Sequence, residues 1–65
     1  MTSQDFSQII SRKHSALIAS PTVETANDLY DAAATIMELT FAVDAKMSAR
    51  AESMMWTAIR LGAAR

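Results

Sequence analysis

The stretch TVETANDLYDAAATIMELTFAVDAKMSARAESMMWTAIRLG, residues 22–62, decides the fold of this chain. It contains no proline, and its single glycine is the last residue. At about 100° per residue, a helix would place ten of its small or apolar side chains in one narrow stripe. This stripe predicts a helical packing surface, and it consists of Leu29, Ala33, Ile36, Thr40, Val43, Met47, Ala51, Met54, Ala58 and Leu61.

Length and composition predict an all-α protein, a small helical hairpin or three-helix unit, in one domain over residues 1–65. Helix-forming Ala, Met, Leu and Glu are abundant, whereas β-branched residues occur singly. A chain of 65 residues buries little surface and usually needs a disulfide, a metal or a second subunit. Because cysteine is absent and histidine occurs once, we expect the fold to be completed by homodimerisation.

Three helices are expected, at about 3–18, 21–43 and 48–62. In the first helix an apolar face contains Phe6, Ile9, Ile10 and Leu17. Ser20-Pro21 separates the first two helices, because proline disfavours helical geometry in the residue before it. Ser20 is the expected N-cap of the second helix, and Gly62 is the expected end of the third.

The region 44–48 allows two interpretations. The stripe continues through it without a change of direction, which favours one helix over residues 22–62. Asp44 or Ser48 could instead cap a new helix after a turn. A single helix of about 40 residues would be about 60 Å long and would need a second chain for stability. We favour the turn, although the loop lacks glycine.

Trp56 is the residue that most clearly indicates a binding surface. Helical geometry places it about 160° away from the stripe, on the polar side of the third helix. Tryptophan and arginine are over-represented among residues that dominate protein interfaces. Trp56 could therefore pack on the first helix, contact a second copy of the chain, or bind a different protein. The predicted partner-binding residues are Glu52, Met55, Trp56, Ile59 and Arg60.

The sequence offers no sign of catalysis, and we predict no enzyme activity. It contains none of the motifs GxSxG, GxxxxGK, HExxH and CxxC. No catalytic, cofactor-binding or metal-binding residues are predicted, and no small-molecule substrate is expected. The formal charge of −1 argues against nucleic acid as a partner, because dedicated nucleic-acid binders carry a basic patch. No apolar run reaches the length of a membrane span, and the N-terminus lacks a signal-peptide pattern, so a cytoplasmic location is expected.

The expected function is therefore that of a small protein-binding regulator or inhibitor. Such a protein would act by occluding a macromolecular partner, as many small phage and mobile-element adaptors of this size do. One alternative is a nucleic-acid-binding helical-hairpin dimer, which needs its basic residues to converge. A second alternative is a structural assembly subunit whose apolar faces are all used in self-association. The basic residues of the first alternative are Arg12, Lys13, Arg50, Arg60 and Arg65.

Overall fold

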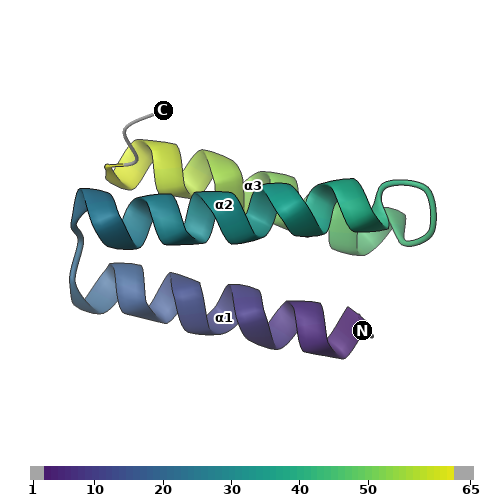
Figure 1. The fold of residues 1–65 in the computed structure, drawn as a ribbon, viewed down its shortest axis with the longest axis horizontal. Coiled ribbons are helices and arrows are strands. Elements are labelled where there is room, and N and C mark those ends of the chain that lie inside the picture. Colours follow the sequence, from purple (N-terminus) through teal and green to yellow (C-terminus); the bar gives the residue numbers. More distant parts are fainter. Residues whose placement is uncertain (1–2, 63–65) are drawn as a thin grey trace.

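A computed structural model describes residues 3–62 of this protein as three α-helices (Figure 1). Helix α1 covers Ser3–Ala19, α2 covers Val23–Thr40 and α3 covers Ala45–Leu61. Each helix runs antiparallel to the one before it, and the Cα positions extend over 32 × 20 × 13 Å. The predicted all-α fold class is thus confirmed over the described range, which contains no strand. Homodimerisation stays a prediction.

A turn separates α2 from α3, so the interpretation as one continuous helix is wrong. The carbonyl oxygen of Thr40 accepts bonds from the backbone N–H groups of Val43 at 3.1 Å and Asp44 at 2.8 Å. The Asp44 carboxylate then accepts the N–H of Met47 at 3.0 Å and caps α3. Asp44 is one of the two expected caps. With Asp44 as the cap, α3 begins three residues before its predicted start at position 48. Helix α2 ends three residues before its predicted end at position 43.

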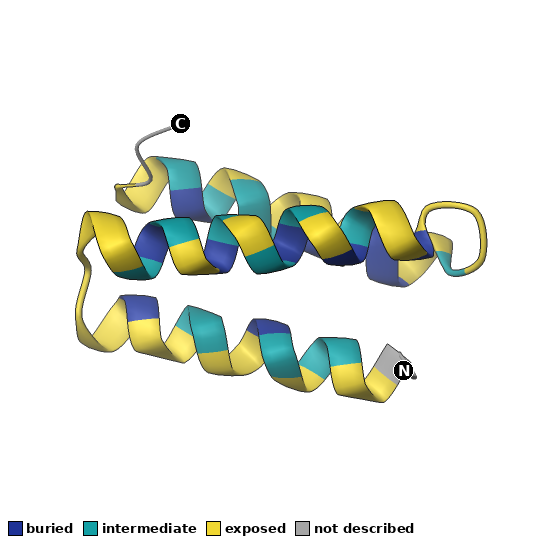
Figure 2. Cartoon of the chain, in the orientation of Figure 1, coloured by how far each residue is buried: buried dark blue, intermediate teal, exposed yellow. Residues whose placement is uncertain are grey.

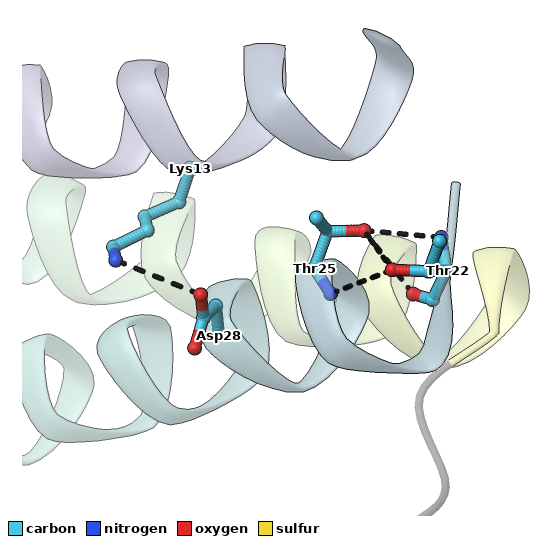
Figure 3. A network of polar contacts seen from close by, with 4 residues as sticks. All are labelled: Lys13, Thr22, Thr25 and Asp28. Carbon is cyan, nitrogen blue, oxygen red and sulfur yellow. Dashed lines mark hydrogen bonds and ion pairs between the residues drawn. The ribbon is translucent and has the colours of Figure 1, made fainter. Parts of the chain in front are cut away.

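Thr22, and not Ser20, is the N-cap of α2 (Figure 3). The Thr22 hydroxyl oxygen accepts the N–H of Thr25 at 3.1 Å, and the Thr25 hydroxyl oxygen accepts the N–H of Thr22 at 3.1 Å. The prediction of Ser20 is wrong because this reciprocal capping box needs a polar side chain three residues after the cap. The Ser20 carbonyl instead accepts the Thr25 hydroxyl at 2.6 Å. Consequently α2 begins at Val23, two residues later than expected.

The core lies between the three helices and consists of two clusters (Figure 2). Met54 contacts both clusters and is half-buried. Helix α1 contributes one fully buried side chain to each cluster, and α2 and α3 provide the rest. The first cluster is Ile10, Ala33, Ile36, Met47 and Ala51, and the second is Leu17, Ala26, Leu29 and Ala58.

The predicted stripe forms most of the contact between α2 and α3, with two exceptions. Val43 is 82% exposed because it lies in the turn, where helical spacing no longer applies. Leu61 is 41% exposed because it is the last residue of α3. Gly62 ends this helix as expected: its φ of +129° is unfavourable for residues with a side chain, and its N–H bonds to the Ala58 and Ile59 carbonyls.

Two buried hydroxyl groups in the core are paired with backbone carbonyls. Thr40 donates to the Ile36 carbonyl at 2.6 Å, within α2. Ser48 donates to the Met37 carbonyl at 3.4 Å, from α3 to α2. No buried side-chain nitrogen or oxygen lacks a partner among the residues that the structure describes. The buried hydroxyls of Thr40 and Ser48 therefore carry no desolvation penalty from an unmade bond.

Four fully buried alanines, which are Ala26, Ala33, Ala51 and Ala58, allow α2 and α3 to approach closely. Replacement of one of them by a larger residue should therefore destabilise the fold. We expect Ala51→Leu to destabilise the protein by about 1–3 kcal/mol, since Ala51 is 0% exposed and the added carbons meet packed neighbours. Ala49→Leu, two residues earlier on the exposed side of α3, is the matched control and should change stability by less than about 0.5 kcal/mol. Urea denaturation of both variants measures the difference. Equal losses would contradict the close contact.

Candidate protein-binding face

Four of the five predicted partner-binding residues lie on the outer side of α3, whereas the fifth, Met55, lies at its edge and packs against the first core cluster. The intervals between the five residues are three, one, three and one residues, so all five lie within about 140° of the helix circumference. Glu52, Trp56 and Arg60 are exposed, and Met55 and Ile59 are half-buried at the edge of this side. The term "α3 outer face" is used below for Glu52, Met55, Trp56, Ile59 and Arg60.

Trp56 is directed outward because the opposite side of α3 holds the core. Ala51 and Ala58 pack against α2, and helical geometry turns Trp56 by roughly 140–160° from both. The Trp56 residue is 59% exposed. A large aromatic side chain with this exposure contributes little burial to the fold of a single copy.

The charged residues of the α3 outer face flank Trp56 by one turn on each side. Glu52 precedes it by four residues and Arg60 follows it by four. The Arg60 guanidinium donates to the Thr57 hydroxyl at 3.4 Å, and that hydroxyl donates to the Ser53 carbonyl at 3.0 Å. Neither Glu52 nor Arg60 forms an ion pair within residues 3–62. Both charges therefore face solvent.

Further apolar side chains are exposed at the two ends of the bundle. At the turn between α2 and α3, Leu39, Phe41 and Val43 are 60%, 77% and 82% exposed. Ile18 and Val23 are exposed at the opposite end, near the connection of α1 to α2. The group at the turn could not be predicted from helical spacing, because the expected helix over 21–43 includes Phe41 and Val43. The capping carboxylate of Asp44 is the signal that could have separated them.

A groove of about 400 Å³ lies between α1 and α2. Phe6, Ile9 and Ile36 give it an apolar lining, and Lys13 and Asp28 are on its rim. The Lys13 ammonium is 4.0 Å from the Asp28 carboxylate, and both side chains are partly exposed (Figure 3). An exposed pair of this kind stabilises a protein by at most about 1 kcal/mol. The other polar residues that line the groove are Asp31 and Thr35.

Two of the basic residues of the nucleic-acid alternative, Lys13 and Arg50, lie on different flanks of α1. Lys13 faces α2 from one flank of α1. Arg50 bonds to the hydroxyls of Ser7 and Ser11 on the other flank of α1. Arg65 lies outside the described residues. The geometry therefore lends no support to a continuous basic patch.

Other classes of site find no support within residues 3–62 either. No group of three or more His, Asp or Glu side chains lies close enough to hold a metal ion there. No helix in that range has both the length and the hydropathy needed to cross a membrane. In comparisons with known proteins, no family model, curated protein or solved structure matches this chain.

Proposed function

We propose that this chain is a small non-enzymatic binding protein that regulates or inhibits a macromolecular partner by occluding it. The α3 outer face is the proposed contact. The observation that carries the proposal is the position of Trp56, which is 59% exposed and opposite the buried side of α3. Truncation of a tryptophan at the centre of an interface commonly reduces affinity by a large factor.

The composition of the core supports a function in binding. Within residues 3–62, nine hydrophobic residues are buried, and four of them are alanines, which leaves five large ones. Seven large hydrophobic residues are exposed in the same range. Six of these seven lie at or near the helix ends, and the seventh, Trp56, lies on the α3 outer face. Association would bury surface that the fold of one copy leaves in water.

A structural assembly subunit is the second candidate function. The exposed apolar residues at both ends of the bundle favour it, because Phe41 and Val43 at one end and Ile18 at the other would allow contacts end to end. In an assembly of this kind, substitutions at either end would abolish association. In the proposed regulator, they would leave binding of the partner intact.

The proposal predicts that Trp56→Ala weakens partner binding by about 2 kcal/mol or more, roughly thirtyfold in affinity. The helical content should stay unchanged, because Trp56 is outside the core. Arg60→Ala should weaken binding less, since a solvated charge contributes little. The measurement is quantitative capture of proteins from a lysate of the source cells by the immobilised chain, followed by titration of the purified captured protein.

Phe41→Ala provides the matched control, because it also removes an exposed aromatic ring, but one that lies in the turn between α2 and α3 and outside the α3 outer face. We expect the captured protein to bind this variant as it binds the unchanged chain. Equal retention by Trp56→Ala and Phe41→Ala would contradict the role of the α3 outer face. Loss of helical content in Trp56→Ala would instead assign Trp56 to the core.

A further inference from the structure

The charges of the α3 outer face have opposite sign at equal distances from Trp56. Glu52 lies four residues before Trp56 and Arg60 four residues after it. At a rise of 1.5 Å per residue, each is about 6 Å from Trp56 along the helix axis. All three side chains are exposed, and no ion pair with another residue in 3–62 holds either charge.

This order of charges is complementary to itself when two helices run antiparallel. A two-fold axis that crosses the helix pair at the level of Trp56 relates the two copies. A residue that follows Trp56 by a given number of positions in one copy then lies level with the residue that precedes Trp56 by the same number in the other copy. Glu52 of each copy then lies at the height of Arg60 of the other, within reach of an arginine side chain. A parallel arrangement would instead bring Glu52 to Glu52 and Arg60 to Arg60.

The apolar residues of the face follow the same operation. Met55 and Ile59 lie along one edge of the face and are half-buried. The two-fold axis brings this edge of one copy beside the same edge of the other, with Ile59 level with Ser53 and Met55 level with Thr57, and the two Trp56 rings meet at the centre. Apolar anchors would thus be central, and charged residues would be at the rim, as in known interfaces.

From this geometry we propose that the partner of the α3 outer face is a second copy of this chain, packed antiparallel about Trp56. The inference rests on the proposed use of this face in protein binding and names its occupant. A contact of one helix with one helix is at the small end of interface sizes, so a dissociation constant on the order of micromolar is expected. Because one face serves both contacts, self-association and binding of another protein exclude each other.

Two charge-reversal variants test the arrangement, measured by sedimentation equilibrium from about 1 to 500 μM. Glu52→Arg brings two arginines to each rim position, and Arg60→Glu brings two glutamates there. Each change converts two attractive contacts into two repulsive ones, so each variant alone should dimerise about tenfold more weakly or worse. An equimolar mixture should form a one-to-one heterodimer, because every Arg then faces a Glu. The double variant should dimerise like the unchanged chain.

The controls are Glu38→Arg and Arg12→Glu, which reverse exposed charges on α2 and α1. They should leave dimerisation unchanged, and circular dichroism should show that all variants remain helical. A monomeric unchanged chain over the whole range would overturn the inference, and so would dimeric single variants or a mixture that stays monomeric. A monomer that captures another protein through Trp56 would overturn this inference alone. A charge-dependent dimer that captures no other protein would overturn the proposed regulatory function alone.

Discussion

Leu29→Ala should destabilise the protein by about 2–5 kcal/mol. Leu29 is 0% exposed and belongs to the cluster that joins Leu17 of α1 to Ala58 of α3. Truncation leaves a cavity that the neighbouring helices fill only in part, because α2 is held by contacts along its whole length. A single core in a chain of this size rarely supplies more than about 3–5 kcal/mol, so the variant should be largely unfolded at room temperature.

Leu39→Ala is the matched control for this prediction. It removes the same atoms from the same helix, but Leu39 is 60% exposed. Leucine and alanine have similar helix propensities, so the difference between the two variants reports burial. Urea denaturation followed by circular dichroism measures both, at one protein concentration because association would contribute to stability. Equal losses for Leu29→Ala and Leu39→Ala would show that the helical phase of α2 is wrong.

Ile36→Ala should also cost about 2–5 kcal/mol, and it tests the other core cluster. Ile36 is 3% exposed and packs with Ile10 of α1 and Met47 of α3. Ile18→Ala is the control, since Ile18 is 61% exposed. Met54→Ala should cost less than Ile36→Ala, because Met54 is half-buried between the clusters.

The experiment for Ile36 also tests whether α1 is part of the folded unit. The Ile36→Ala substitution removes a side chain that packs against Ile10 of α1. Hydrogen exchange of the backbone amides should therefore become faster in α1 as well as in α2. If denaturation gave Ile36→Ala and Ile18→Ala the same small loss, the first cluster would contribute nothing to stability.

The helices could be predicted from the sequence because their apolar residues follow helical spacing. Their ends could not be predicted in the same way, because each end depends on which of several neighbouring polar residues caps the helix. Asp44 was one of the two predicted caps of α3. Because it is the cap, α2 is shorter and α3 is longer than the sequence predicted. Ser20 precedes a proline and resembles a cap, yet the hydroxyl oxygens of Thr22 and Thr25 each accept the backbone N–H of the other residue. Spacing alone does not reveal which polar side chain completes such a reciprocal pair.

The orientation of Trp56 could be predicted because it depends only on the phase of α3. Its angle from Ala51 and Ala58 follows from helix geometry once those residues face the core. The exposure of Phe41 and Val43 could not be predicted, because it depends on where the turn lies. The groove beside Lys13 was also missed, since it depends on the separation of α1 from α2, and no local pattern encodes that distance.

The short connections of the bundle have a consequence for the rate at which the chain folds. Three residues join α1 to α2, and four join α2 to α3, so each helix packs first against its neighbour in sequence. Closing such short loops costs little entropy, and chains dominated by local contacts cross a low barrier, often within microseconds to milliseconds. A newly made chain would therefore expose its apolar stripe only briefly before α2 and α3 cover it.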